Sequence, residues 1–205
     1  NLDFDRTMSS EHEVLFSSIS KNKNISIQNI LEIGTFDGYN ALLLSKLFPN
    51  SMIDTIDLPN ENEDFINFYE RKNIVKKFIE QRDKILSNEH KINFIQMNSL
   101  NLINHIKKYD LIWIDGAHGY PVVCVDIINS INLISNGGLI ICDDIYENLE
   151  FSKSDKMYNS NASYETLKIL EKQKIIKLEL IFKRVSAKEN CVSNERKFIA
   201  IFKKT

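Results

Sequence analysis

The chain has 205 residues and a mass of 23.8 kDa, with 43% hydrophobic and 26% charged residues. This is the composition of an ordinary globular protein with room for one well-buried domain, so we expect a single domain over residues 1–205. The formal net charge is -2 and the isoelectric point is near 6.1, which excludes the basic surface that general nucleic-acid binding requires, and no apolar run is long enough to cross a membrane.

Short apolar runs alternate with helical patterns along most of the chain, which is typical of a parallel sheet with crossover helices. The first expected strand is continuously apolar, as is usual for a strand covered on both faces, and Pro49 ends the helix after it. The last two strands have no helix between them, so they should pair antiparallel. In chain order, the sequence predicts helix 9–20, strand 29–34, helix 40–48, strand 52–57, helix 63–86, strand 92–97, helix 101–107, strand 110–115, helix 121–134, strand 138–144, helix 163–172, and two strands within 174–185 and 196–202.

Two regions stand outside this alternation. Residues 1–24 form a helical lead-in, in which Val14 and Ile19 belong to an apolar series at helical spacing. Residues 60–90 form a helical insertion that is longer than a crossover needs. Together with the loop 146–161, this insertion is a lid, a dimer surface or a solvated helical surface, and the sequence leaves the three open.

Cysteine usage bears on the cellular compartment. Cys124, Cys142 and Cys191 are odd in number and far apart, and some of them lie inside apolar strands. This pattern favours reduced cysteines that serve in packing, and it predicts a cytoplasmic protein. The polar start of the chain does not have the composition of a signal peptide.

A tight turn is expected where the first strand meets its helix, in the segment 31–44 with the sequence LEIGTFDGYNALLL. Gly34 ends the strand and Gly38 begins the helix, and glycine there allows a sharp turn and a close approach of the backbone to a ligand. The helix N-terminus supplies N–H donors, and Asp57 ends the second strand, where an acid accepts ribose hydroxyls. Two glycines alone would make only a tight turn, but strand, glycines, helix, second strand and acid in this order predict a nucleotide site.

The same turn distinguishes between nucleotides. A dinucleotide fold has the pattern G-x-G-x-x-G, so that the diphosphate lies against the helix. Here Phe36 stands at the second glycine position and Asp37 adds a negative charge, and both features disfavour a diphosphate. A cofactor with a sulfonium and an ammonium group tolerates these acids, and Glu32 and Asp37 would attract it. The charge pattern therefore favours S-adenosylmethionine over NAD.

The segment 31–44 closely resembles motif I of the class I S-adenosylmethionine-dependent methyltransferases, especially the catechol and caffeoyl-CoA O-methyltransferase-like group. A second segment, 109–145 with the sequence YDLIWIDGAHGYPVVCVDIINSINLISNGGLIICDDI, resembles the sugar and macrocin-type O-methyltransferases. In those families one strand ends in I-D-G-x-H-x-Y and the next ends in an acidic pair. The resemblance extends over residues 7–145, and the remainder of the chain matches only in architecture.

The resemblance implies an α/β fold, namely a Rossmann-like three-layer αβα sandwich. Its seven-stranded, mostly parallel sheet has the order 3-2-1-4-5-7-6 and ends in a C-terminal antiparallel hairpin. The cofactor is expected over the ends of the first, second and fourth strands, with its methionine part along the glycine turn, its ribose at Asp57 and its adenine near Asn98 and Ser99. The expected cofactor-binding residues are Glu32, Gly34, Thr35, Gly38, Asp57, Asn98, Ser99 and Asp115. A homodimer is expected from the resemblance alone.

Three acids are expected to meet at this edge of the sheet. Asp115 ends the fourth strand, and Asp143 and Asp144 end the fifth. Three neighbouring carboxylates repel one another unless they are protonated or bridged by a cation, and oxygen ligands suit Mg²⁺ better than zinc. The resemblance also implies Mg²⁺ on these three acids, with the hydroxyl oxygen of a small-molecule acceptor on the metal. The alternative is that the acids cap turns, and the acid pair itself departs from the Asp-Asn of the catechol-type site.

A general base is predicted close to these acids. His118 lies three residues after Asp115 in the loop DGAHGY, and a neutral imidazole there would take the proton from the acceptor hydroxyl during methyl transfer. His118 and Asp115 are therefore the predicted catalytic residues. His12, His90 and His105 do not lie beside these strand-end acids in the sequence, and we assign them no role.

Four other functions stay open at this point. The first is an NAD-dependent oxidoreductase on a similar sheet, which the missing glycine pattern and the C-terminal hairpin disfavour. The second is a non-catalytic S-adenosylmethionine-binding module, which would not need the acids and His118 together. The third and fourth are metal-independent N- or C-methyltransferases. The sequence indicates no nucleic-acid or membrane partner, and it does not identify the acceptor.

Overall fold

The fold is built around one seven-stranded sheet of order β3-β2-β1-β4-β5-β7-β6. The structure is a computed structural model that describes residues 10–67, 73–149, 160–183 and 197–205. Strands β1 to β5 pair in parallel, whereas β7 pairs antiparallel with both β5 and β6. The elements are α1 (Ser10–Ser20), β1 (Asn29–Ile33), α2 (Tyr39–Leu47), β2 (Met52–Asp57), α3 (Glu63–Asn67), α4 (Val75–Ser87), β3 (Ile92–Gln96), the 3₁₀ helix η1 (Ser99–Asn104), β4 (Tyr109–Ile114), α5 (Val122–Leu133), β5 (Ile134–Tyr146), α6 (Ala162–Lys172), β6 (Ile176–Phe182) and β7 (Lys197–Lys204).

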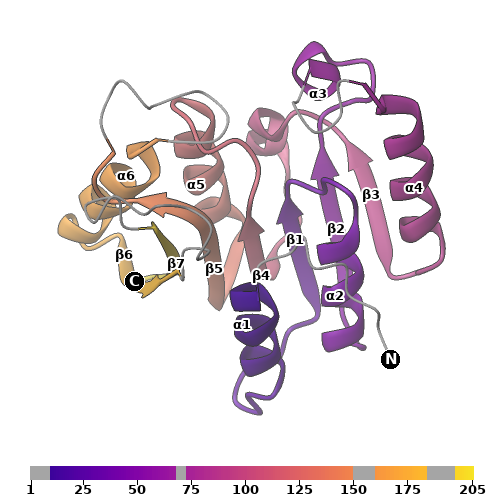
Figure 1. The fold of residues 1–205 in the computed structure, drawn as a ribbon. Helices are drawn as coiled ribbons and strands as arrows, with labels where there is room; N and C mark the ends of the chain where they lie inside the picture. The colour runs from indigo at the N-terminus through magenta and orange to yellow at the C-terminus, as the bar shows by residue number, and fades with distance from the viewer. Residues whose placement is uncertain (1–9, 68–72, 150–159, 184–196) are drawn as a thin grey trace.

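Helices cover both faces of this sheet (Figure 1), which confirms the predicted sandwich. On one face α2 contacts both α1 and α4, and on the other face α5 contacts both η1 and α6. Neighbouring strand residues point to opposite faces, so Ile30 packs in the core beside Leu44 of α2 while Leu31 packs in the core beside Ile127 of α5. The continuous apolar runs of the sequence arise from this double burial.

The structure corrects the predicted helices at three places. The helix predicted over 63–86 is interrupted, because Ile74 has φ -135, which is not helical, and α4 begins only after it. The helix predicted over 101–107 is a short 3₁₀ helix that ends before His105, where the backbone becomes extended. In α1 the fully buried apolar residue is Phe16, whereas Val14 is 66% exposed.

Strand β5 is longer than predicted and irregular at its end. It runs over 13 residues, and its pairing with β7 shifts register between Cys142 and Ile145. Asp144 lies inside this bulge with φ 53. A β-bulge redirects side chains that would otherwise alternate between the two faces of the sheet, so it determines where the acid pair points.

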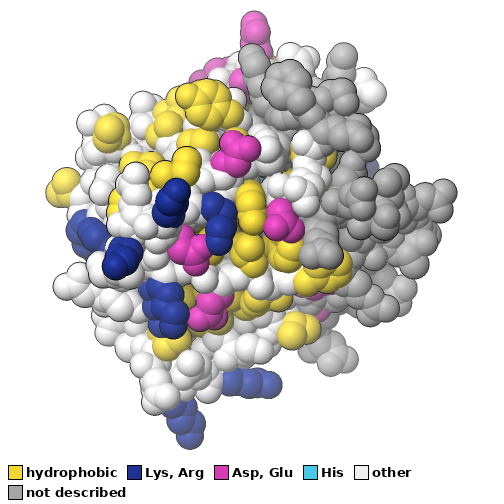
Figure 2. Space-filling model, turned by 90° about the vertical axis from the view of Figure 1, so that its left-hand side faces the viewer, with side chains coloured by type: hydrophobic (Ala, Val, Ile, Leu, Met, Phe, Trp, Pro, Cys, Tyr) yellow, Lys and Arg dark blue, Asp and Glu magenta, His cyan; other side chains and the backbone are white. Residues whose placement is uncertain are grey.

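Within the part of the chain that the structure describes, the side that carries α6 and β6 has no patch of one charge. Figure 2 shows lysine and acidic side chains interspersed there with apolar ones. Among the described residues, none of the helices combines the length and the apolar character that a membrane-spanning segment needs. Cys191 and most of the loop 146–161 fall outside the described residues.

Candidate functional site

The turn between β1 and α2 forms the first wall of the site. Gly34 has φ +101 and Gly38 has φ +83. Residues with a Cβ adopt such positive φ angles only at a cost in free energy. A Cβ on Gly34 would lie 2.2 Å from the carbonyl oxygen of Asp115. The backbone of β1 therefore passes directly against the end of β4, and only glycine fits at that contact.

Asp57 forms the second wall, at the end of β2. Its Oδ2 accepts a hydrogen bond from the backbone N–H of Phe36 at 3.0 Å, and its Oδ1 accepts one from the N–H of Leu58 at 2.8 Å. The carboxylate thus ties the glycine turn to the β2 loop. Its position at the end of β2 is the one predicted for a ribose-binding acid, and ribose binding by Asp57 stays a prediction.

A buried hydrogen-bond network within β1, β2 and α2 supports the turn. Glu32 is fully buried in β1, where its Oε1 accepts a hydrogen bond from Asn40 at 2.6 Å and its Oε2 accepts one from the hydroxyl of Thr55. Thr55 also shares a 2.6 Å hydrogen bond with Thr35. Glu32 and Thr35, both expected to bind the cofactor, therefore interact with the scaffold of the turn, and Glu32 reaches no solvent.

Replacing Glu32 by glutamine should flatten the pH dependence of stability. Burial raises the pKa of Glu32 from 4.5 to about 8, so the folded protein holds a proton there that the unfolded chain releases above pH 4.5. The stabilising contribution of this group is complete below the unfolded pKa and is lost as the pH rises towards 8. Denaturant unfolding of both proteins at several pH values between 5 and 8 measures this. An equally steep decline in the Glu32→Gln variant would contradict the assignment.

The residues predicted near adenine lie at the end of β3. The side chain of Asn98 accepts a hydrogen bond from the N–H of Leu100 at 3.0 Å and so caps η1. The backbone carbonyl of Ser99 accepts a hydrogen bond from Asn129 of α5 at 3.4 Å. These contacts fix the loop after β3, and adenine binding by the two residues stays a prediction.

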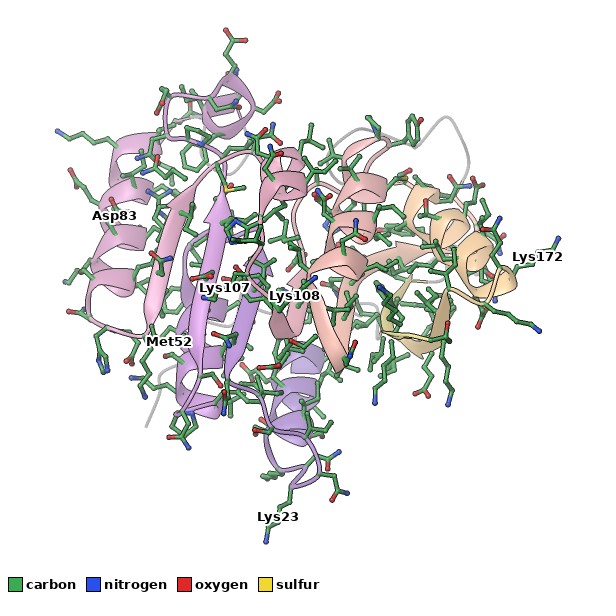
Figure 3. The ribbon with its side chains drawn as sticks, turned by 180° about the vertical axis from the view of Figure 1, so that it is seen from behind. Lys23, Met52, Asp83, Lys107, Lys108 and Lys172 are labelled. Atoms are coloured by element: carbon green, nitrogen blue, oxygen red, sulfur yellow. The ribbon has the colours of Figure 1, made fainter. Side chains whose placement is uncertain are left out.

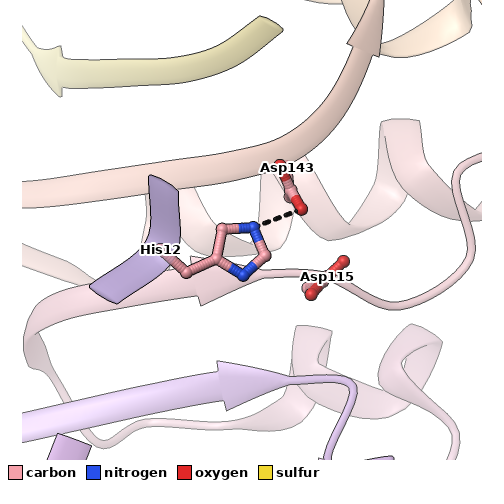
Figure 4. Close-up of side chains that lie close together, drawn as sticks. All are labelled: His12, Asp115 and Asp143. Carbon is pink, nitrogen blue, oxygen red and sulfur yellow. Dashed lines mark hydrogen bonds and ion pairs between the residues drawn. The ribbon is translucent and has the colours of Figure 1, made fainter. Parts of the chain in front are cut away.

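An acidic cluster lies at the ends of β4 and β5, on the face that α1 covers (Figure 4). His12 of α1 places its Nε2 2.7 Å from Oδ2 of Asp143, and His12, Asp115 and Asp143 offer three potential ligand atoms within 4.8 Å of one another. Burial raises the pKa of Asp115 to about 6, with a further contribution from the charge of Asp143. Burial would also raise the pKa of Asp143, but the hydrogen bond from His12 and the charge of Lys183 hold it below its usual range.

Two lysines complete this cluster from the other side. Lys183 lies directly after β6, and its Nζ is 2.6 Å from both Oδ2 of Asp143 and Oδ1 of Asp144. Lys197 begins β7, and its Nζ is 2.6 Å from Oδ2 of Asp144. Burial opposes their positive charge, but the neighbouring carboxylates outweigh it and raise the pKa of both lysines.

His118 lies beside the cluster, as its position in the sequence suggests. Its Nε2 is 3.6 Å from Oδ1 of Asp115, and its side chain is largely buried. Asp115 itself keeps 31% of its side chain exposed, so the pair is accessible from the rim of the sheet. The structure therefore brings the two predicted catalytic residues together.

Sequence reasoning missed three residues of this cluster: His12, Lys183 and Lys197. For His12 a weak signal exists, because it stands one helical turn before Phe16, and both rings contact Trp113 of β4, at centroid distances of 4.8 and 5.1 Å. For the lysines there is no local signal. Lys183 and Lys197 come together because the N–H of Lys183 donates to the carbonyl of Lys197 at 2.8 Å across the hairpin.

A family model described as a methyltransferase domain matches residues 31–145 of the chain, which include the glycine turn, Asp57 and the three acids of the cluster. The chain belongs to this methyltransferase family. Together with the strand order, the match identifies a class I methyltransferase that uses S-adenosylmethionine and resembles the O-methyltransferases. No curated protein matches this methyltransferase in sequence.

Solved structures of methyltransferases share the fold at low sequence identity. A Staphylococcus aureus protein provisionally assigned as a caffeoyl-CoA O-methyltransferase has a TM-score of 0.63 at 20% identity, over 97% of this chain and 85% of that one. An O-methyltransferase from Bacillus cereus in complex with SAH has a TM-score of 0.60 at 17% identity, over 98% and 83%. The N-methyltransferase NodS from Bradyrhizobium japonicum WM9 has a TM-score of 0.61 at 14% identity, over 95% and 94%. The fold therefore does not distinguish oxygen from nitrogen as the acceptor atom.

The methyltransferase site fits S-adenosylmethionine. The Cβ position of Gly34 is occupied by the backbone of Asp115, so the turn admits only glycine there. Asp57 is the last residue of β2, the place where an acid accepts ribose hydroxyls in nucleotide-binding sheets. A hydrogen bond from the N–H of Phe36 joins the turn to this carboxylate.

The predicted magnesium ligands fit less well. Both oxygens of Asp144 are occupied by ammonium groups, and Oδ2 of Asp143 is shared by His12 and Lys183. The candidate group in the structure is instead His12, Asp115 and Asp143, and its imidazole suits a transition metal better than Mg²⁺. Since the predicted all-oxygen set Asp115, Asp143 and Asp144 does not fit Mg²⁺, we derive no step through a metal.

Proposed function

We propose that this methyltransferase transfers the methyl group of S-adenosylmethionine to a hydroxyl group of a small molecule. The observation that carries the proposal is the pair His118 and Asp115 at the rim, with Nε2 and Oδ1 3.6 Å apart. A hydroxyl is a poor nucleophile until it loses its proton, so O-methylation needs a base at the reacting atom. An amine acceptor has much less need of such a pair.

In this reaction the cofactor supplies an electrophilic methyl group, and the side chains of the protein accept the proton of the acceptor hydroxyl. When bound, the cofactor would give up its methyl carbon to the acceptor oxygen, and the sulfur would keep the electron pair of the broken carbon–sulfur bond. The hydroxyl proton passes to Nε2 of His118, and the carboxylate of Asp115 beside it stabilises the charged imidazole that results. With its pKa raised to about 6, Asp115 is a stronger base than an ordinary carboxylate and remains largely ionised at neutral pH.

Two versions of the reaction compete with this one. In a metal-assisted version, His12, Asp115 and Asp143 would be the candidate ligands and the metal would lower the pKa of the hydroxyl. In a nitrogen-directed version, the acceptor is an amine, as the name of the NodS neighbour indicates for that protein.

Replacing His118 by alanine should lower kcat about 100-fold for a hydroxyl acceptor, because the proton then has no imidazole to receive it. The measurement uses S-adenosylmethionine with a ¹³C-labelled methyl group, a panel of sugar, catechol and amine acceptors, and NMR of the products. His105→Ala is the matched control, since the ring of His105 bonds to Tyr109, which begins β4 at the end opposite to Asp115. Labelled methyl groups on nitrogen alone, or an unchanged kcat in His118→Ala, would overturn the proposal.

A further inference from the structure

We propose that Lys183, Lys197 and His12 form a built-in cationic cluster that takes the place of a divalent metal beside the methyl-transfer site. The acidic pair at the end of β5 would then be a structural partner of these cations and not a metal site, and methyl transfer would be independent of metal. The inference rests on the family assignment, and it holds for any acceptor.

The first support is the matching of charges. Three carboxylates lie together at this edge of the sheet, and such a group requires protonation or a bridging cation. The structure supplies two ammonium groups and one imidazole at hydrogen-bond distance from two of these acids. A divalent ion would add two positive charges within a few ångströms of two ammonium groups that already neutralise the acid pair, so its binding would be opposed.

The second support is the backbone geometry. Asp143 and Asp144 are consecutive residues of a strand, and in a regular strand their side chains would point to opposite faces. The bulge in β5 and the φ of 53 at Asp144 bring both carboxylates to the single Nζ of Lys183. The pairing of β6 with β7 fixes the position of the two lysines, because a backbone hydrogen bond joins Lys183 and Lys197. Two independent local structures therefore converge on the same contact.

The third support is burial. Lys183 and Asp143 are 9% and 2% exposed, and a buried lysine is retained only when it has anionic partners. Lys197 also lies over the ring of Tyr146, with Nζ 5.4 Å from the ring centroid. One atom of the cluster, Oδ1 of Asp143, is buried without a hydrogen-bond partner in the described part of the chain. If the ammonium groups were removed, this oxygen would be the natural first ligand for a metal.

The test is whether removing the lysines creates a metal site. We would titrate Mn²⁺ and Mg²⁺ into the wild type and into Lys183→Met, Lys197→Met and the double variant, by calorimetry and by electron paramagnetic resonance of free Mn²⁺, without any acceptor. We expect weak or no binding to the wild type and binding at least about 100-fold tighter in the double variant, since each lost ammonium group removes a repulsive charge a few ångströms from the ion. Because lysine loss lowers stability, the melting temperature is also measured, and Mn²⁺ should raise it in the variants but not in the wild type.

Lys107→Met is the matched control. Lys107 (Figure 3) pairs with a buried acid, Asp54, at 2.7 Å, but it belongs to a different cluster with Asn93 and Tyr109. Its loss should lower stability without creating a metal site. Micromolar binding of Mn²⁺ or Mg²⁺ to the wild type, or no gain of affinity in the double variant, would overturn the inference. Either result is independent of the acceptor, so it leaves the proposed O-methylation to be judged by its own assay.

Discussion

Replacing Gly34 by alanine is expected to abolish S-adenosylmethionine binding and to lower the free energy of unfolding by about 4 kcal/mol. The new Cβ would lie 2.2 Å from the carbonyl oxygen of Asp115 and 2.6 Å from its carbonyl carbon. Both atoms belong to the backbone, so neither can swing away, and β1 and β4 must separate at the point where we predict that the cofactor binds. Calorimetric titration and denaturant unfolding of the variant measure the two effects.

Gly137→Ala separates this contact from the cost of the backbone conformation. Gly137 also has a positive φ, +79, but a Cβ there would have nothing within 4 Å. Its replacement should cost about 1 kcal/mol and leave cofactor affinity unchanged. Equal losses of stability in the two variants would show that backbone strain alone is responsible and that the close contact of β1 with β4 is unimportant.

Replacing Asp57 by alanine should weaken S-adenosylmethionine binding about 100-fold, because two charge-assisted hydrogen bonds to the ribose are lost. The variant also loses the acceptor for the N–H groups of Phe36 and Leu58, so a moderate loss of stability accompanies it. Calorimetry with the cofactor and with S-adenosylhomocysteine measures the affinity. Binding within threefold of the wild type would show that the ribose does not lie at this carboxylate.

Asp110→Ala is the control for the loss of stability. Asp110 also accepts two backbone hydrogen bonds, from Gln28 at 2.9 Å and from Asn29 at 3.0 Å, but it does so at the start of β1. Both variants therefore remove a carboxylate that accepts two backbone hydrogen bonds, Asp57 beyond the carboxyl ends of β1 and β2 and Asp110 at the start of β1. A loss of affinity in Asp57→Ala alone would assign the effect to the cofactor site.

The sheet and the glycine turn were predictable because their signals are local. Apolar runs and helical periods follow one another along the sequence. The apolar runs arise because the strands are buried on both faces, and the helical periods arise because each helix is buried on one face. Gly34, Gly38 and Asp57 lie at strand ends that topology brings together, so their spacing was sufficient to place them. The segment 63–86 was predicted less well, because no glycine or proline in the sequence marks the break at Ile74.

The cationic partners of the acidic cluster could not be predicted from the sequence. Its acids were recognised because they end neighbouring strands, and their need for a cation was a sound electrostatic inference. The cations themselves come from α1 and from a hairpin whose two lysines are 14 positions apart (from 183 to 197). A bulge at Asp144 turns the acid towards them. Such contacts depend on tertiary packing, and no spacing rule within one segment reveals them.

Calorimetric titration of the wild-type protein with S-adenosylmethionine and S-adenosylhomocysteine tests the central claim most directly. The site at Gly34 and Asp57 is held in place by hydrogen bonds within the protein, so little ordering should oppose binding. We expect both ligands to bind with a dissociation constant on the order of micromolar, and NAD not to bind. Absence of binding by either ligand would contradict the assignment of this turn as a cofactor site.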